Sequence, residues 1–400
     1  MTMRISTLWA QQMAVNQMLD NQSKLSTIQQ QVASGKRLVS PASDPAASAR
    51  ALNLTHYETA ISQYQRNMDA GNNRLGIEDQ ALSSTVKVLQ SVRSLTLEGM
   101  NATQSATSRQ NVATQISEQL KQILQIANTQ DAGGGYIFAG NSTHTQPFVQ
   151  GPTGVTYQGD QGQRRIAIAA AQTVAVGDPG SQVFQQIPTG NGSFAISAAA
   201  ANQGTAVVGA GNVSNPTLWN GGSYTLQFTA PNSYQVVDAG NNVVTSGSYQ
   251  AGDTITFKGI SLTLSGTPVT GDNFQIGPST KQSVFSTVQS IVKALSSSVV
   301  TGTQRAQFEQ QINGQLNNLD QALNRLVNVR AAVGSRMQVM TQQKTVSANV
   351  SLQVKTTLSG LTDLNYASAI SKLNLQMTAL QASQQVYVKV QGLSLFNYVK

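Results

Sequence analysis

The chain has 400 residues, enough for two or three domains, and 40% of them are apolar, enough to build cores. Only 10% are charged, well below the roughly 25% of an average soluble protein, so amides and hydroxyls supply most of the polar surface. The absence of cysteine excludes disulfides, thiolate metal sites and cysteine catalysis.

The net charge of +8 arises after residue 280, where eleven Lys and Arg face three Asp and Glu. These charges are spaced, without a block of like charge or interleaved aromatic residues, so they favour a helix surface over a nucleic-acid site. The N-terminal sequence MTMRISTLWAQQMAV lacks the apolar region of a signal peptide. No apolar run approaches the ~20 residues of a membrane span, so we expect no membrane insertion.

The N-terminal segment predicts a helix with an assembly seam. Met18, Leu25 and Val32 are seven residues apart, and Leu8 and Val15 form a second row at the same spacing. Seven-residue spacing of apolar side chains is typical of coiled coils. We therefore predict that these five residues contact partner helices.

A joint follows this first helix. Gly35 can adopt the left-handed conformation that ends a helix, and Pro41 pushes the residue before it into an extended conformation. Asp44 can cap the next helix, with Pro45 at the first helical position, where its missing N–H costs nothing. The sequence therefore predicts a first domain, residues 1–44, made of an assembly helix and its joint.

The helical pattern continues over residues 45–140, which predicts the first half of a helical body. Leu54, Tyr57 and Ile61 recur there at steps of three and four, as on one face of a helix. Three glycines in the stretch DAGGGYIFAGN end this pattern. A similar pattern returns over residues 281–358, which predicts the second half of the body.

Between the two halves, residues 141–280 predict an inserted antiparallel β domain. Side chains alternate in polarity with a period of two, as in YTLQF and ITFKGISLTL. This pattern favours a sandwich or a partly open barrel, and Lys258-Gly259 predicts a tight hairpin turn. The Ala, Gly and Asn-rich stretch 197–216 predicts either a division into two lobes or a long loop.

A helix break predicted near Ser359-Gly360 separates the body from a C-terminal assembly helix, residues 359–400. The apolar residues of this helix follow steps of four and three, which is a heptad pattern. A stripe of this length is marginal alone and needs a partner helix. The residues of the seam are Tyr366, Ile370, Leu373, Met377, Leu380 and Tyr387.

Together these segments predict an α+β protein. It is an elongated helical bundle built from both chain ends, with terminal coiled-coil helices and an antiparallel β domain inserted in the middle. The two terminal seams can pair with each other or with neighbouring subunits, and their mixed Met, Gln and Tyr content favours association between subunits. Because turn-rich stretches bound the β region, we expect that residues 142–278 can be deleted without unfolding the body.

Both chain ends resemble the flagellin superfamily. MRISTLWAQQMAVNQMLDNQSKLSTIQQQVASGKRLVSPASDPAASA is similar to its N-terminal region, and LNYASAISKLNLQMTALQASQQVYVKVQGLSLFNYV is similar to its C-terminal helix. The ending LSLFNYV and the segment GGGYIFAGN resemble the hook–filament junction proteins of this superfamily, the FlgL family, more than flagellin. The resemblance covers residues 1–145 and 285–400.

This resemblance implies a structural protein of the bacterial flagellum. It would be exported unfolded through the flagellar type III apparatus and would lie outside the cell, between the hook side and the filament. The implied partners are copies of the chain in a ring-like layer, the other hook–filament junction protein, flagellin, and an export chaperone at the C-terminal helix. The first helix would pair with the last one on assembly.

The sequence offers no site for catalysis or for a cofactor. His56 and His144 lie in different segments without metal-ligand spacing, and Gly35-Lys36 lacks the rest of a phosphate loop. We therefore expect no metal, no cofactor and no enzyme activity. Two alternatives remain: flagellin itself, and a secreted adhesin or carbohydrate-binding protein on a helical stalk, which exposed Tyr and Trp clusters would favour.

Overall fold

The computed structural model describes the backbone of residues 2–392, with the side chains of residue 9 and residues 11–389. The chain divides into two compact units. We call them the terminal unit, residues 1–66 and 343–400, and the central unit, residues 67–342. Both chain ends therefore belong to one unit, and the middle of the chain forms the other.

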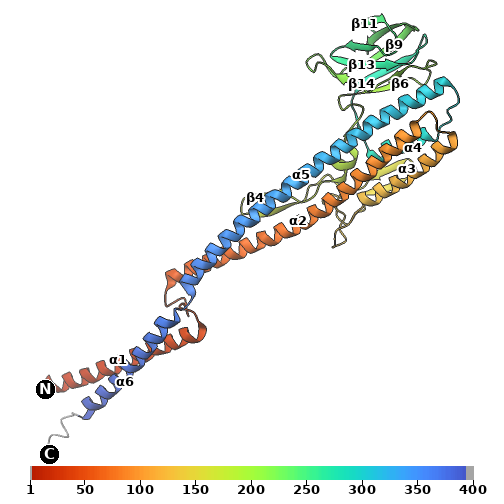
Figure 1. Ribbon diagram of the computed structural model, residues 1–400. Helices are drawn as coiled ribbons and strands as arrows, with labels where there is room; N and C mark the ends of the chain where they lie inside the picture. Colours follow the sequence, from red (N-terminus) through yellow and green to blue (C-terminus); the bar gives the residue numbers. More distant parts are fainter. Residues whose placement is uncertain (1, 393–400) are drawn as a thin grey trace, which may run out of the picture. The chain divides into compact units, whose positions relative to one another are not determined.

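Helices occupy both ends of the chain and antiparallel strands occupy its middle, which confirms the predicted α+β class (Figure 1). The helix break predicted near Ser359-Gly360 is present three residues later: α5 continues through both residues to Thr362, and the next helix begins at Tyr366. A single glycine costs a helix only about 1 kcal/mol, and the next helix starts where Asn365 Oδ1 accepts from the Ser368 N–H at 3.1 Å. The helices are α1 (Thr2–Ser34), α2 (Pro45–Met100), α3 (Ala106–Ala127), α4 (Val284–Leu295), α5 (Gly302–Thr362) and α6 (Tyr366–Gly392).

Two heptad rows of buried side chains, one on α2 and one on α5, run through the helical core of the central unit. Ion pairs flank these rows: Arg330 of α5 lies 2.9 Å from Asp79 of α2, and Arg93 of α2 lies 2.8 Å from Asp320 of α5. Arg330, which interrupts the apolar pattern of α5, therefore has a partner on α2. The buried rows are Ile312, Leu319, Leu326, Val333 and Met340 on α5, and Met68, Leu75, Leu82, Leu89 and Thr96 on α2.

Residues 131–190 lie on these helices, and we call them the wrapping segment. The rings of Phe148 and Phe184 are fully buried, 5.1 and 5.9 Å from the ring of Phe285 on α4. Asn128, which follows α3, exchanges hydrogen bonds of 2.8 and 2.9 Å with the backbone of Phe148. The wrapping segment therefore completes the helical core. Its elements are β1 (Phe148–Gly151), β2 (Gly154–Tyr157), β3 (Arg165–Ala169), β4 (Gln172–Ala175), the π-helix η1 (Ser181–Gln185) and β5 (Ile187–Pro188).

Residues 194–278 form an antiparallel sandwich with a core of its own. One sheet has the order β11-β10-β9-β14-β6, and the other has the order β12-β13-β7, with β8 also paired to β13. A short strand, β15 (Lys281–Gln282), follows the sandwich and pairs with β5. The strands of the sandwich are β6 (Phe194–Ala198), β7 (Val207–Val208), β8 (Asn212–Val213), β9 (Tyr224–Ala230), β10 (Ser233–Asp238), β11 (Val243–Ser248), β12 (Thr254–Phe257), β13 (Ile260–Ser265) and β14 (Asn273–Pro278).

Local predictions about the sandwich have different outcomes. Lys258-Gly259 forms the predicted two-residue turn between β12 and β13, and both residues have positive φ, 44° and 77°. The stretch 197–216 is neither a divider nor a long loop, because it contains the end of β6 and the paired strands β7 and β8. The ring of Trp219 packs on Phe194 and Tyr224 at 5.6 and 6.1 Å. These aromatic residues build the core and do not form the exposed cluster that an adhesin would need.

The wrapping segment also brings Asp178 into a buried cluster of charges. Arg336 of α5 donates to both carboxylate oxygens of Asp178, at 2.9 and 3.0 Å, and Gln163 donates at 2.7 Å. The Asp178 N–H donates to Glu78 Oε1 of α2 at 3.1 Å. Burial, reinforced by the charge of Asp178 and opposed by Arg336, raises the pKa of Glu78 to about 8. Glu78 is therefore largely protonated in the folded chain at neutral pH.

We expect the stability of the central unit to fall as the pH rises from about 4.5 to about 8. In this range the folded chain keeps a proton on Glu78 that the unfolded chain has lost, which favours folding at the lower pH by about 1.4 kcal/mol per unit of pKa difference. Urea unfolding between pH 5 and pH 9 measures the slope. Glu78→Gln should flatten it, and Glu118→Gln, at an exposed site on α3, should not. A slope that survives Glu78→Gln would assign it to other groups.

Candidate assembly site

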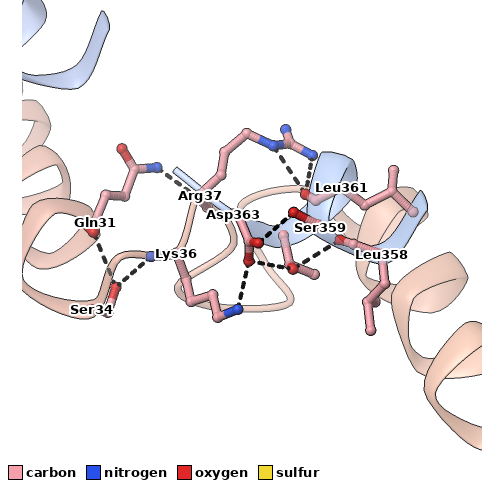
Figure 2. A network of polar contacts seen from close by, with 9 residues as sticks. Gln31, Ser34, Lys36, Arg37, Leu358, Ser359, Leu361 and Asp363 are labelled. Atoms are coloured by element: carbon pink, nitrogen blue, oxygen red, sulfur yellow. Dashed lines mark hydrogen bonds and ion pairs between the residues drawn. The ribbon is translucent and has the colours of Figure 1, made fainter. Parts of the chain in front are cut away.

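The joint brings together two breaks in the chain, one between α1 and α2 and one between α5 and α6 (Figure 2). Gly35 ends α1 with a φ of 68°, the left-handed conformation predicted for it. Lys36 and Asp363 form an antiparallel bridge, and Lys36 Nζ lies 2.6 Å from Asp363 Oδ1. The Leu364 N–H donates to the Gly35 carbonyl at 3.0 Å. An ion pair and backbone hydrogen bonds therefore connect the two segments between the helices.

Arg37 binds the end of α5 through its carbonyl groups. Its backbone N–H donates to Thr362 O at 2.7 Å, and its Nε and Nη2 donate to Leu361 O at 3.1 and 2.8 Å. A guanidinium beside the last carbonyls of a helix also interacts favourably with the negative end of the helix dipole. A residue that follows α1 thus caps α5, which lies more than 300 residues later in the chain.

Asp363 is the acidic centre of this network. The Lys36 ammonium, together with the hydroxyls of Ser359 and Thr362, lowers the pKa of Asp363 to about 2. The two hydroxyls donate to its carboxylate at 2.6 and 3.1 Å. The carboxylate is exposed, so water screens these pairs and they orient the two chain segments more than they stabilise them. The Asp363 carboxyl group therefore stays ionised throughout the neutral pH range.

The helix α2 begins as the sequence predicted. Pro45 is its first residue, and Asp44 Oδ1 accepts from the Ala47 N–H at 3.0 Å. Beside this start lies a mainly apolar groove of about 750 Å³, with Pro41 in its wall. Its apolar lining consists of Leu38, Val39, Pro41, Pro45, Ala49, Ala51, Leu52 and Leu358.

Helices α1 and α6 lie side by side and antiparallel (Figure 1). A Cβ atom on Gly35 would lie 2.9 Å from the Tyr366 hydroxyl, whereas Asn21, further from the joint, bonds to Gln376. Residues before the joint in α1 therefore face residues after it in α6, at increasing distance from the joint. The resemblance implied that the first and last helices pair on assembly, and the structure shows them paired within one chain.

The structure separates the predicted seam residues into two groups. Tyr366, Ile370 and Met377 are 51%, 48% and 43% exposed. The side chain of Leu8 lies outside those that the structure describes. The half-buried residues along the helix pair are Val15, Met18, Leu25, Val32, Leu373, Leu380 and Tyr387.

The sequence and the structure of the chain were compared with those of known proteins. The model of the bacterial flagellin N-terminal helical region matches residues 5–143. Flagellar hook-associated protein 3 of Salmonella typhimurium is 24% identical over 394 residues, covering 98% of this chain and 99% of the relative. The crystal structure of Xanthomonas campestris FlgL is 33% identical, with a TM-score of 0.72, and covers 76% of this chain and 99% of that one. The chain belongs to the FlgL family.

FlgL is hook-associated protein 3, so the chain has a structural role in the flagellum, at the hook–filament junction. The crystal structure of flagellar hook-associated protein 3 from Legionella pneumophila is 30% identical to this chain, with a TM-score of 0.75. The match covers 77% of this chain and 98% of the Legionella chain. By contrast, Serratia marcescens flagellin is 26% identical over 33% of this chain. The predicted family is therefore confirmed, and the relatives are structural proteins.

Sequence reasoning missed the polar and small residues of the seam in this FlgL chain. Asn21 and Ala369 are buried on α1 and α6, and Ile28, Gln376 and Ser383 are half-buried. They occupy the second heptad row of each helix, at seven-residue spacing from one another. The seven-residue spacing could have identified this second row in the sequence. It was missed because a search restricted to large apolar residues does not count amides, hydroxyls and alanine.

The terminal unit of this FlgL chain is basic by composition. Its sequence holds eleven Lys and Arg against four Asp and Glu, a net charge of +7 out of +8 for the chain. No helix within residues 2–392 is long and apolar enough to span a membrane. Over the same described residues, no group of three or more His, Asp or Glu could hold a metal ion.

Proposed function

We propose that the subunit assembles into the hook–filament junction through its terminal unit. The observation that carries this proposal is a set of large apolar side chains that remain exposed on the helix pair, outside its seam. Exposed apolar patches of this kind mark contacts between proteins. The residues are Trp9, Met13 and Leu19 on α1, and Ile370, Leu375, Met377, Val386 and Val388 on α6.

The proposed neighbours are copies of the chain in a ring-like layer, the other hook–filament junction protein, and flagellin. The subunit acts by holding these proteins together and catalyses no reaction. It reaches the outside of the cell unfolded, through the flagellar type III apparatus. An export chaperone covers α6 beforehand, since an exposed apolar stripe on an unpartnered helix is an aggregation hazard. Membership of the FlgL family and the exposed stripe support this sequence of events.

The charge of the terminal unit bears on the nature of its neighbours. Terminal units of identical copies, each with a net charge of +7, repel one another. We therefore infer that the other junction protein or flagellin presents acidic surface to this unit. Such contacts are screened by salt, so assembly should weaken as the ionic strength rises.

The double variant Ile370→Asp/Met377→Asp tests the proposed interface. Both residues are nearly half exposed in the subunit, so the substitutions should leave the α1–α6 pair and the fold intact. In a packed interface an unpaired buried carboxylate is strongly unfavourable, so we expect loss of filament attachment. Circular dichroism checks the fold, and complementation of a strain that lacks its junction protein, read by motility and electron microscopy, checks assembly.

Two matched variants complete this experiment. Val243→Asp/Val269→Asp places the same charge on exposed apolar residues of the sandwich and should assemble normally. Leu373→Asp/Leu380→Asp charges the half-buried seam and should abolish both assembly and chaperone binding. Normal motility of the Ile370→Asp/Met377→Asp variant would place the interface elsewhere.

A further inference from the structure

A polar cluster lies in the seam between α1 and α6. Asn21 is only 7% exposed, and its Oδ1 accepts a hydrogen bond from Gln376 Nε2 at 3.1 Å. Its Nδ2 donates to Ser383 Oγ at 3.3 Å, and Gln17 Nε2 donates to its Oδ1 at 3.3 Å. Among the side chains described on the two helices, only Asn21 and Ala369 are buried. A buried amide thus lies at the centre of this polar cluster.

We propose that Asn21, Gln376 and Ser383 set the register in which α1 and α6 pair. Gln376 and Ser383 are one heptad apart, and the Asn21 amide bonds to both, so it lies between them. A slip of one heptad moves α6 by about 10 Å along its axis. After that slip, the Asn21 amide retains at most one of these two partners. Leaving a buried amide unsatisfied disfavours the slipped register by about ten-fold or more.

The apolar residues of the seam do not select the register by themselves. Met18, Leu25 and Val32 repeat every seven residues on α1, and Leu373 and Leu380 do so on α6. A slip of one heptad therefore replaces one apolar contact with another of similar kind. A buried polar residue is the device by which coiled coils distinguish such equivalent registers.

The joint also restrains the register, but only at one end of the pair. Asn21 lies fourteen residues before Gly35, about 21 Å along α1. The ties at the joint are exposed ion pairs and hydrogen bonds between Gly35–Arg37 and the chain around Asp363. The polar cluster is therefore a second restraint. It acts inside one chain and does not depend on the docking of the outer faces proposed above.

Because the chain contains no cysteine, disulfide trapping can measure the register directly. Seven residues separate Ile28 from Asn21, and this spacing places Ile28 opposite Leu373 in the antiparallel pair. The pair Ile28→Cys/Leu373→Cys therefore reports the native register, and Ile28→Cys/Leu380→Cys reports a slip of one heptad. A disulfide needs Cα atoms within about 7 Å, so neither pair reports the other register.

The restraint from the joint must be removed for this test. Inserting eight Gly and Ser residues between Ser34 and Gly35 keeps the bonds of Gly35 to the joint and releases α1. Eight residues reach up to about 26 Å, which is ample for a slip of one heptad. All trapping measurements use the full-length chain with this insertion, in a glutathione redox buffer.

With Asn21 and Gln376 native, we expect the native-register disulfide to form about ten times faster than the slipped one, or more. In the Asn21→Leu/Gln376→Leu variant we expect the two rates to agree within about two-fold, with helix content by circular dichroism unchanged or higher, because Leu suits a coiled-coil seam. Equal rates with the native cluster would assign the register to the joint alone. A high ratio in the Leu variant would assign it to the apolar residues, and the absence of both disulfides would show that the pair does not form. Each of these three results overturns the proposal.

Discussion

A chain in which a short Gly-Ser bridge joins Ser193 to Ser279, in place of the sandwich, should fold its helices and keep most of its stability. The Ser279 N–H donates to the Ser193 carbonyl at 3.0 Å, so a few residues span the gap. The sandwich has its own apolar core. It bonds to α5 through amides, as where Gln310 Oε1 accepts from the Val208 N–H at 2.6 Å. Losing a few such bonds should lower the free energy of unfolding by no more than about 2 kcal/mol.

Deletion of 142–278, which the sequence suggested, should instead unfold the central unit. It removes Phe148 and Phe184, whose rings pack on Phe285, and it removes Asp178 from Arg336. Truncating one buried Phe costs about 3–5 kcal/mol, so losing both costs about 6–10 kcal/mol, which is comparable to the whole stability of a typical domain. Thermal unfolding followed by circular dichroism should show a cooperative transition for the first deletion only. A cooperative transition for both would mean that the helices do not need the wrapping segment.

Arg336→Met should lower the free energy of unfolding of the central unit by about 3–5 kcal/mol, because it leaves a buried carboxylate without its counter-charge. Asp178 is 6% exposed and receives both of its charged hydrogen bonds from Arg336. Glu78, directly beside it, cannot compensate, since it is another carboxyl group. Urea unfolding at pH 7 measures the loss.

Arg330→Met is the matched control, on the same helix. Its partner Asp79 has 40% of its side chain exposed, so this pair should contribute no more than about 1 kcal/mol. A further variant, Asp178→Asn/Arg336→Met, also removes the unpaired carboxylate charge of Asp178. It should recover part of the free energy of unfolding that Arg336→Met loses. Equal destabilisation by Arg330→Met and Arg336→Met would argue that burial of the Asp178 pair has no energetic consequence.

Features with local causes could be predicted from the sequence. The end of α1 at Gly35 and the start of α2 at Asp44-Pro45 depend on neighbouring residues, as does the hairpin turn at Lys258-Gly259. The strands of the sandwich follow from alternation over a few residues. The order of helices, strands and helices followed from these patterns, and the motifs at both chain ends identified the family.

Features that depend on distant residues could not be predicted. The bridge that connects the end of α5 to the joint pairs Asp363 with Lys36, and neither residue signals the other in the sequence. The wrapping segment reads as ordinary turn-rich chain, because only its buried rings, such as Phe148 and Phe184, connect it with the helices. Asn21 is polar, and only its two partners on α6 explain its burial.

The bridge between Lys36 and Asp363 has a consequence for the order of folding. It joins residues 327 positions apart, and contacts of such separation form after local ones because a long loop must first be closed. Helix α1 can become helical early, but it cannot bury its seam until α6 exists. In a chain that emerges with its N-terminus first, the seam of α1 therefore stays exposed until α6 has been made. Synthesis of α6 is the event that allows this seam to be buried.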